Sequence, residues 1–550
     1  MKGQAIDSCH AAAYRSPGER TVFELDAVSF RFPDGRLVLQ DIALSIFEGD
    51  RIALVGPNGA GKTTLAKLLN GLYRPVSGRI NYLGQPVKGD HLWKTRLEVG
   101  ILFQDPDNQL FSNTLYDDVA FGPFNQGLAR KQVELRVDEA IRKVGLQQLL
   151  YKAPHHLSYG QKKRAALATL LSMRPQVLIL DEPTANLDPK QEAIFFELLR
   201  EFDGTLICIS HDLPFLYRLC LRAVVLADGR LQHDLPMQDF ISHRHSLRDH
   251  GLDFTFRIAC CRNSHGPHPH QHHPPPPSAG APTRDTVQLA PATVSVAPPL
   301  LELQDYSYRY PDGTWGCRDI SFSVQKGEKL ALAGENGAGK STLVACLMGI
   351  LQGTGQYRFG GLPVDGKLRR NLWRHVGMVF QDPADQLFCP SCLEETAFGP
   401  KQLRLSAEEI QQRAHEALAQ VRLDGFEKRV PHHLSAGERK RLAIASVLSM
   451  RPEVLILDEP TANLDPRSEE LILEILQQLD VTLLLITHDL FFITALCERT
   501  LVMHRGTLVR DYPTDDFAHD AHLSTVNGLN YHFKEGCCQE IARLQQAAMV

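Results

Sequence analysis

Two stretches of this chain carry glycines, then a lysine and a hydroxyl residue, at one fixed spacing. Residues 56–63 and 334–341 both fit G-x-x-x-x-G-K-[ST]. In this pattern the glycines let backbone N–H groups face phosphate oxygens, and the lysine reaches the terminal phosphates. We therefore expect two polyphosphate-binding loops. Their contact residues are Gly56, Pro57, Asn58, Gly59, Ala60, Gly61, Lys62, Thr63 and Thr64 in one loop, and Gly334, Glu335, Asn336, Gly337, Ala338, Gly339, Lys340, Ser341 and Thr342 in the other.

Four further motifs follow each loop in the same order, so the chain contains an internal repeat. Each half continues with Phe-Gln-Asp-Pro, then Leu-Ser-x-Gly, then an apolar run ending in Asp-Glu-Pro-Thr, and finally a histidine before an aspartate. One glycine loop alone would be only moderately specific, whereas two unrelated domains would have to share every motif by coincidence. The repeat indicates two copies of one nucleotide-binding domain.

The segments around each loop have the patterns of the elements that must position it. A short apolar strand precedes the glycines and a helix follows them, as the motif requires. These segments are 51–55 and 64–71 in the first half, and 329–333 and 342–349 in the second. The runs 177–180 and 454–457 are short and wholly apolar, which is typical of parallel strands buried on both faces. The patterning predicts an α/β fold with a P-loop sheet in each half.

Hydrolysis of ATP requires positive charge on the β- and γ-phosphates, a held Mg²⁺ ion and a water aligned with the leaving group. Each half has one residue type for each task. A lysine binds phosphate, a hydroxyl and a strand-end aspartate hold Mg²⁺, and the glutamate after that aspartate is the candidate general base. These residues are Lys62, Thr63, Asp181 and Glu182 in the first half, and Lys340, Ser341, Asp458 and Glu459 in the second.

With these motifs in this order, the chain resembles the ABC-type ATPases over most of its length. The resemblance implies two tandem P-loop nucleotide-binding domains, each with a mainly parallel sheet core, an antiparallel β subdomain and a helical subdomain. It implies ATP and Mg²⁺ as cofactors, and hydrolysis coupled to transmembrane transport. It also implies that His211 and His488 sense the γ-phosphate and orient the attacking water, and that Gln104 and Gln381 contact Mg²⁺ and water.

The same resemblance places the Leu-Ser-x-Gly motifs across an interface between the halves. Ser158 and Gly160, like Ser435 and Gly437, should open a helix whose N–H groups and dipole favour the γ-phosphate. In the head-to-tail arrangement of the family, the lysine of each half works opposite the serine of the other. ATP then closes this intramolecular dimer and hydrolysis reopens it.

Two positions depart from the family pattern. Tyr159 and Ala436 stand where Leu-Ser-Gly-Gly-Gln has its first glycine. Since both halves keep their lysine, glutamate and histidine, two competent sites are expected. Phe32 and Tyr310 match the adenine-stacking aromatic of the family, and packing in the core is the competing explanation for both.

A more specific segment begins at each Phe-Gln. Gln-Asp-Pro-x-x-Gln-Leu-Phe occupies residues 104–111 and 381–388, and Ala-Phe-Gly-Pro follows at 120–123 and 397–400. This segment resembles the ATPases of energy-coupling-factor importers, which take up vitamins and transition-metal ions. In that family it lies beside the groove that receives the coupling helices of the membrane scaffold. The resemblance implies an integral membrane transport scaffold and a substrate-capture membrane protein as partners, with this chain at the cytoplasmic face of the cell membrane.

Other classes remain open on the sequence. The ATPase of an ABC exporter would carry the same cassette motifs. A soluble twin-cassette protein acting on ribosomes or nucleic acid typically has a long charged helical linker, an iron–sulfur region or zinc insertions, none of which is visible here. Within the importer-like segment, Gln109 and Gln386 have the competing explanation that they cap a loop.

The composition is that of an ordinary globular protein. Hydrophobic residues make up 43% and charged residues 22%, and a net charge of −5 gives no global drive toward nucleic acid. The sequence has no run of about 18 uncharged apolar residues, so membrane association is expected to come through a partner. The 12 cysteines lack a regular disulfide spacing, and Cys389 and Cys392 form a C-x-x-C that is either a redox or metal site or a pair of ordinary thiols.

The repeat and the composition divide the chain into five segments. These are a flexible N-terminal tail (1–20), a first ATPase domain (21–255), a His/Pro-rich linker (256–298), a second ATPase domain (299–515) and a C-terminal tail (516–550). The linker cannot build a core, and its length permits the two domains to lie face to face. Its histidines are either transition-metal ligands or solvated low-complexity sequence.

Overall fold

The computed structural model describes residues 20–242, 298–462 and 464–519. Both expected domains lie largely within these ranges. Nearly all of the expected linker and both expected tails lie outside them, so the linker histidines and the segment boundaries stay predictions.

Each half begins with a four-stranded antiparallel sheet. Its strand order is β2-β1-β4-β5 in the first half and β12-β11-β14-β15 in the second. The strands are β1 (Thr21–Arg31), β2 (Leu37–Phe47), β4 (Ser77–Tyr82), β5 (Gln85–Pro86), β11 (Leu301–Arg309), β12 (Trp315–Val324), β14 (Thr354–Phe359) and β15 (Leu362–Pro363). Buried and exposed residues largely alternate along β2 and β12, because one face of this sheet covers the core and the other faces solvent.

A six-stranded sheet forms the centre of each half. The orders are β10-β9-β3-β8-β7-β6 and β16-β17-β18-β13-β19-β20, with parallel pairing except at the β9–β10 and β19–β20 hairpins. The strands are β3 (Arg51–Val55), β6 (Val99–Leu102), β7 (Val177–Asp181), β8 (Thr205–Ile209), β9 (Arg222–Ala227), β10 (Arg230–Pro236), β13 (Lys329–Gly334), β16 (Val376–Val379), β17 (Val454–Asp458), β18 (Thr482–Ile486), β19 (Arg499–His504) and β20 (Thr507–Pro513). The predicted α/β fold is confirmed.

The wholly apolar strands are explained by two cores on opposite faces of the central sheet. In β7, Leu178 and Leu180 pack into the core under the helices, whereas Val177 and Ile179 pack into the core shared with the antiparallel sheet. Since successive side chains of a strand point to opposite faces, both faces need apolar residues. The second half repeats this division, with Leu455 on one side and Ile456 on the other.

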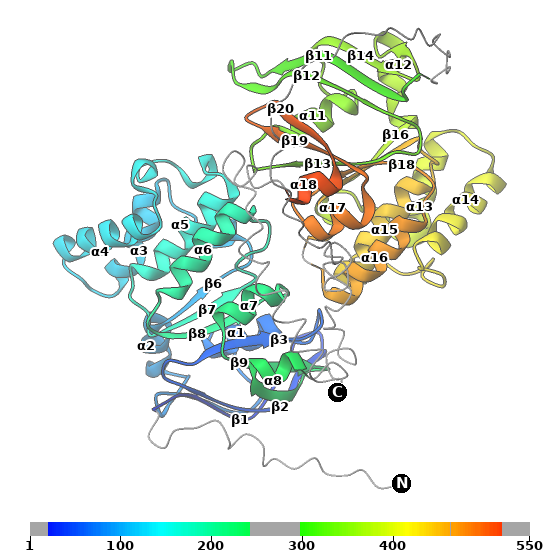
Figure 1. The fold of residues 1–550 in the computed structure, drawn as a ribbon. Coiled ribbons are helices and arrows are strands. Elements are labelled where there is room, and N and C mark those ends of the chain that lie inside the picture. Colours follow the sequence, from blue (N-terminus) through cyan, green and yellow to red (C-terminus); the bar gives the residue numbers. More distant parts are fainter. Residues whose placement is uncertain (1–19, 243–297, 463, 520–550) are drawn as a thin grey trace, which may run out of the picture.

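Helices cover the central sheet and form a separate helical lobe in each half. Figure 1 shows α3 and α4 beside α5, and α13 and α14 beside α15. The helices are α1 (Lys62–Leu69), α2 (Asp90–Glu98), α3 (Leu115–Asn125), α4 (Arg130–Lys143), α5 (Tyr159–Leu171), α6 (Pro189–Arg200), α7 (Leu213–Leu219), α8 (Met237–Ser242), α11 (Lys340–Leu347), α12 (Gly366–Asn371), α13 (Cys392–Gln402), α14 (Ala407–Gln420), α15 (Ala436–Leu448), α16 (Pro466–Gln478), α17 (Leu490–Leu496) and α18 (Thr514–His519). The helices expected after the glycine loops are present and begin two residues earlier than expected, at each lysine.

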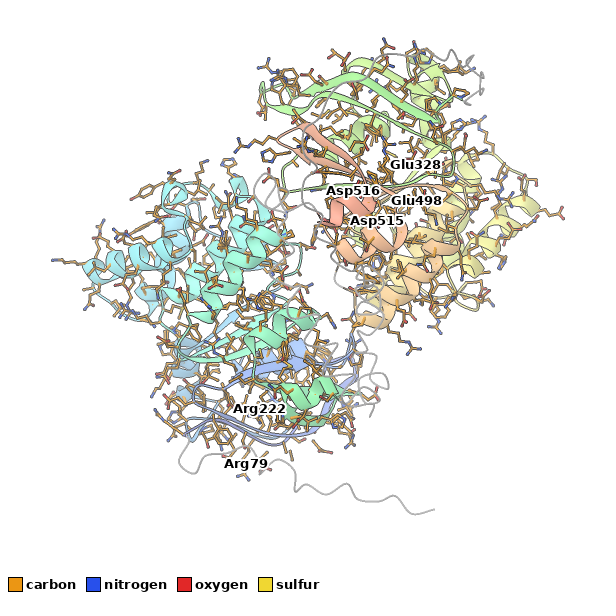
Figure 2. All side chains as sticks on the ribbon, viewed as in Figure 1. Arg79, Arg222, Glu328, Glu498, Asp515 and Asp516 are labelled. Carbon is orange, nitrogen blue, oxygen red and sulfur yellow. The ribbon has the colours of Figure 1, made fainter. Side chains whose placement is uncertain are left out.

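A partly buried arginine joins the two sheets of each half, since Arg222 donates to the backbone oxygen of Ser45 in β2 and Arg499 to that of Ser323 in β12. Arg222, labelled in Figure 2, makes ion pairs of 2.7 Å with Asp50 and 2.6 Å with Asp234, and its side chain is only 15% exposed. Arg499 repeats this in the second half with Glu328 at 2.9 Å and Asp511 at 2.6 Å. Each guanidinium ties the end of a central strand to the neighbouring hairpin and turn, which fixes the antiparallel sheet next to the glycine loop.

Candidate nucleotide sites in two halves

The glycine loops have a backbone that only glycine can adopt without strain or collision. Gly61 and Gly339 lie at φ 99° directly before α1 and α11, and neither helix has a side-chain cap at its N-terminus. A Cβ atom on Gly56 would lie 2.1 Å from the backbone oxygen of Leu226. The uncapped N–H groups at these helix starts are therefore available to an anion.

Both loop lysines are held inside their loops. The Nζ of Lys62 donates to the carbonyl oxygens of Gly56 at 2.6 Å and Pro57 at 3.0 Å, and Lys340 repeats these bonds with Gly334 and Glu335 at 2.6 and 2.9 Å. Burial lowers the pKa of Lys62, while the nearby acidic side chains oppose that shift. A phosphate would supply the negative charge that this buried ammonium lacks.

The first half has donors and acceptors that suit Mg²⁺ beside a phosphate. The Oγ1 of Thr63 donates to Oδ2 of Asp181 at 2.8 Å. Two buried nitrogens in the same site, Nδ2 of Asn58 and Nδ1 of His211, have no hydrogen-bond partner among the described residues. A hydroxyl and one carboxylate, completed by phosphate oxygens and water, are the ligands that Mg²⁺ prefers. Mg²⁺, when bound, supplies positive charge at the β- and γ-phosphates.

The candidate general bases have strained backbones. Glu182 and Glu459 lie at φ 47° and 42°, in the left-handed region that costs a non-glycine residue about 1–3 kcal/mol. Their N–H groups are held by the carbonyl oxygens of Ile209 at 2.9 Å and Ile486 at 2.8 Å, at the ends of β8 and β18. The central sheet therefore fixes the position of both glutamates.

The glutamate and histidine are paired differently in the two halves. Nδ1 of His488 lies 2.8 Å from Oε1 of Glu459, and the Thr487 hydroxyl donates to Oε2 of the same carboxylate at 2.8 Å. In the first half, Nε2 of His211 lies 3.5 Å from the carboxylate of Glu182 and 3.1 Å from Oδ1 of Asn58. The first-half imidazole is thus shared with the glycine loop.

These contacts give the two glutamates opposite pKa shifts. Burial raises the pKa of Glu182 to about 7, although the charge of Lys62 opposes the shift. Burial also raises the pKa of Glu459, but the charge and hydrogen bond of His488 outweigh it and lower that pKa overall. Burial lowers the pKa of His211 to about 3, so its imidazole is neutral. The strand-end aspartates both have raised pKa values because they are buried, to about 6 for Asp458.

Each signature serine begins a helix as its N-cap. Ser158 and Gln161 form a capping box at the start of α5, and Ser435 and Glu438 form another at the start of α15. These boxes occupy both serine hydroxyls. The family resemblance predicts contact of both serines with phosphate, and their capping role was not predicted, although the Ser-x-x-Gln and Ser-x-x-Glu spacing signals it.

The first candidate nucleotide site is a cavity of about 830 Å³ between the two halves. The first half lines it with Phe32, Lys62, Gln104, Asp181, Glu182, His211 and most of the glycine loop. The second half contributes residues from the start of α15, from the segment before α16 and from its own Gln-Asp-Pro segment, so the predicted site residue Gln381 lines the first cavity. These residues are Ala436, Arg439, Lys440, Ala462, Leu464, Gln381, Asp382 and Pro383. Among the described residues, Ser435 and Gly437 flank Ala436 but do not line this cavity. Arg439, Lys440, Ala462 and Leu464 were not predicted as site residues, although Ala462 and Leu464 lie directly after the repeated Asp-Glu-Pro-Thr.

The second site also has residues of both halves. Asn186 of the first half accepts two hydrogen bonds from the second half. Asn336 of the second glycine loop donates to the backbone oxygen of Asn186 at 3.4 Å, and Nε2 of Gln381 donates to Oδ1 of Asn186 at 2.8 Å. The negative charge of Asp188, in the first half, favours the charged form of Lys340 and so opposes the lowering of its pKa by burial. The glycine loop of each half therefore faces the other half, while the expected placement of Ser435 opposite Lys62 and of Ser158 opposite Lys340 stays a prediction.

The aromatic residues expected at adenine lie beside the loops. Phe32 lines the cavity, packs edge-on against Phe30 and Tyr73, and has the Arg36 guanidinium 5.2 Å from its ring centre. Tyr310 is 38% exposed, and its hydroxyl lies 2.8 Å from Oγ1 of Thr342. Both rings border a glycine loop, and their contact with adenine stays a prediction.

The C-x-x-C pair has the character of ordinary thiols. Cys389 and Cys392 are both free, and burial raises the pKa of each to about 11. Within the part of the chain that the structure describes, no group of three or more His, Cys, Asp or Glu residues could hold a metal ion. The described residues also include no helix long and apolar enough to cross a membrane.

The fold and the paired loops define a protein with two nucleotide-binding domains in tandem. The family model described as ABC transporter matches residues 39–185 and 317–462. A protein of Methanosarcina acetivorans is 34% identical over 89% of this chain and 85% of its own length, and one of Streptomyces coelicolor is 44% identical over 44% of this chain and 94% of its own length. The names of both describe ABC transporter ATP-binding proteins.

Among solved structures, cbiO1 from Clostridium perfringens, part of the ABC transporter complex cbiONQ, is 36% identical. It covers 44% of this chain and all of its own length, with a TM-score of 0.39. On the family model and the relatives, the chain belongs to the ABC transporter ATP-binding family. It is an ATP-binding ATPase with two cassettes.

Proposed function

We propose that this chain energises an importer of the energy-coupling-factor type, taking up a transition-metal ion or a vitamin. It does so at the cytoplasmic face of the cell membrane, against a membrane scaffold that works with a substrate-capture protein. The observation that carries the proposal is a matched pair of exposed phenylalanines in each half. Phe111 and Phe121 are 69% and 51% exposed with ring centres 5.1 Å apart, and Phe388 and Phe398 are 65% and 41% exposed at 4.9 Å.

Each exposed phenylalanine pair follows closely on a glutamine, Gln109 or Gln386, that hydrogen-bonds to the start of the glutamine loop. Oε1 of Gln109 accepts from the N–H of Phe103, and its Nε2 donates to Ala166 and Thr169 of α5 at 2.9 Å. Gln386 makes the same set of bonds to Phe380, Ala443 and Ser446. These glutamines tie the loop to the signature helix, which is more than the capping of a loop. A partner seated on the phenylalanines would therefore be linked to both parts of the ATP site.

The ATPase cycle follows from residues of this chain. Lys62 and Lys340 would bind phosphate, Thr63, Ser341, Asp181 and Asp458 would hold Mg²⁺, and Gln104 and Gln381 would contact the ion and the water. Glu182 and Glu459 take the proton of the attacking water at an Oε atom, while His211 and His488 orient it. ATP draws the halves together because residues of both halves line the first cavity and meet at the second glycine loop, and product release lets them part.

The test is association and transport with the full chain. A Phe111→Ser/Phe388→Ser variant should lose co-purification with its membrane partner and lose ATP-dependent uptake of labelled Co²⁺, Ni²⁺ or vitamin, while its basal ATPase persists. Leu221→Ser/Ile350→Ser is the control, because these residues are similarly exposed, at 70% and 67%. ATP-driven efflux would assign an exporter instead, and binding to ribosomes or nucleic acid without a membrane partner would assign the soluble class.

A further inference from the structure

Tyr159 has a polar role that its place in the signature motif does not require. The residue is half-buried, and its ring packs against the core of the first half. Its hydroxyl reaches beyond that packing and donates to the backbone oxygen of Gln104 at 3.2 Å. The side chain also hydrogen-bonds with Asn186. One hydroxyl thus joins the signature helix, the glutamine loop and the segment after the catalytic glutamate.

Asn186 extends this link into the second half. Its Oδ1 accepts from Nε2 of Gln381 at 2.8 Å, and its backbone oxygen accepts from Asn336 at 3.4 Å. Asn186 is held at φ 62°, a left-handed backbone that aims its side chain and carbonyl at these partners. A continuous path of hydrogen bonds therefore runs from the glutamine loop of one nucleotide site to the glutamine loop and glycine loop of the other.

The mirrored position lacks this hydroxyl. Ala436 replaces Tyr159, and the glutamine-loop carbonyl of the second half is held instead by Lys440, whose Nζ donates to Gln381 at 2.8 Å. The matching lysine of the first half, Lys163, donates to the carbonyl of Glu182 at 2.7 Å. In the first half the tyrosine holds the glutamine loop and the lysine holds the catalytic glutamate. The hydrogen bonds that hold the glutamine loops therefore differ between the two halves, although their motifs match.

We propose that the Tyr159 hydroxyl is a positioning group that couples the two nucleotide sites through Asn186. Nucleotide at the second site fixes Asn336 and Gln381, which hold Asn186, and Tyr159 then holds the glutamine loop of the first site in place. By linkage, nucleotide at the first site favours binding at the second by the same factor. The inference rests on the two-site ATPase and not on the transported molecule.

The experiment measures ATP binding to the full chain carrying Glu182→Gln and Glu459→Gln, which prevents turnover. Calorimetric titration with Mg²⁺ and ATP gives the number bound and the coupling factor between the sites. Adding Tyr159→Phe should lower the coupling factor about five-fold, the effect of one hydrogen bond, and leave Tm unchanged. Tyr151→Phe makes the same chemical change at a side chain that is 77% exposed, and should leave the coupling as it was.

A second variant removes the middle of the path. Asn186→Gly deletes the amide, while glycine accepts φ 62° without strain. It should lower the coupling at least as much, and combining it with Tyr159→Phe should add little, because both break one path. This variant decides the matter if Tyr159→Phe lowers Tm.

If each variant binds two ATP molecules with unchanged coupling, the proposed coupling through Tyr159 and Asn186 is wrong, while the two-site function stands. Additive losses in the combined variant would also overturn this coupling, since they would show two independent structural effects. Binding of one ATP per chain would contradict the two-site function itself, and with it the coupling between the sites.

Discussion

Nδ1 of His488 lies 2.8 Å from Oε1 of Glu459, and the equivalent pair in the first half is looser at 3.5 Å. Thr487 adds a second hydrogen bond to Glu459. At the position of Thr487 the first half has Ser210, and both hydroxyls accept from the N–H of the aspartate two residues later. The two catalytic sets, nearly identical in sequence, therefore differ in geometry.

Removing either general base should stop its own site. Glu182→Gln and Glu459→Gln keep the side-chain volume but cannot accept the proton, so each should lower turnover at its own site about 10²- to 10⁴-fold. Phosphate release by the single and double variants is the measurement, and the exposed Glu134→Gln is the control. If one substitution leaves the rate unchanged while the other abolishes it, the expectation of two competent sites is wrong.

The two sites should have different pH profiles. Glu182 has its pKa raised to about 7 by burial, and a general base works only when deprotonated. In Glu459→Gln, where only Glu182 works, kcat/KM should fall as the pH drops through about 7. In Glu182→Gln, kcat/KM should persist to lower pH, because His488 and Thr487 hold the pKa of Glu459 below its usual value despite burial. Coincident profiles would contradict the assignment.

A methyl group on the first glycine of a loop should empty one site. The Cβ of Gly56→Ala would meet the backbone oxygen of Leu226 at 2.1 Å, which the sheet cannot move aside. We expect at least about ten-fold weaker ATP binding at the first site, and at the second site a loss no larger than the coupling factor between the sites. Gly35→Ala is a matched control, because its Cβ would meet nothing within 4 Å. Equal binding by both variants would show that the loop does not depend on this close approach.

Removing the partly buried Arg222 should destabilise the first half. Arg222→Met leaves Asp50 and Asp234 without their cation at a site that is mostly buried, and the free energy of unfolding should fall by about 3–5 kcal/mol. Arg79→Met removes a single 3.4 Å pair from an arginine that is 79% exposed, so it should cost about 0–1 kcal/mol. Both residues are labelled in Figure 2, and urea unfolding of the two variants makes the comparison.

The family and the α/β fold were predictable because they depend on local patterns. Glycine loops, apolar strands and the strand-end Asp-Glu pairs each act within a few residues, so their spacing is visible along the chain. The repeat then excluded coincidence. The expected strands 51–55 and 177–180 are present as β3 and β7. Residues such as Lys62 and Asp181 were identifiable for the same reason, and the structure brings them into one cavity.

The features that could not be predicted from the sequence depend on contacts between distant segments. Nothing in the order of residues marks Arg439 or Leu464 as facing the first glycine loop, because that contact exists only once the two halves meet. Tyr159 was visible only as a departure from glycine, and its bonds to Gln104 and Asn186 appear only in three dimensions. The sequence determined which chemistry each half can perform. The tertiary structure decided how the halves share it, since burial and distance set the pKa values and link the sites.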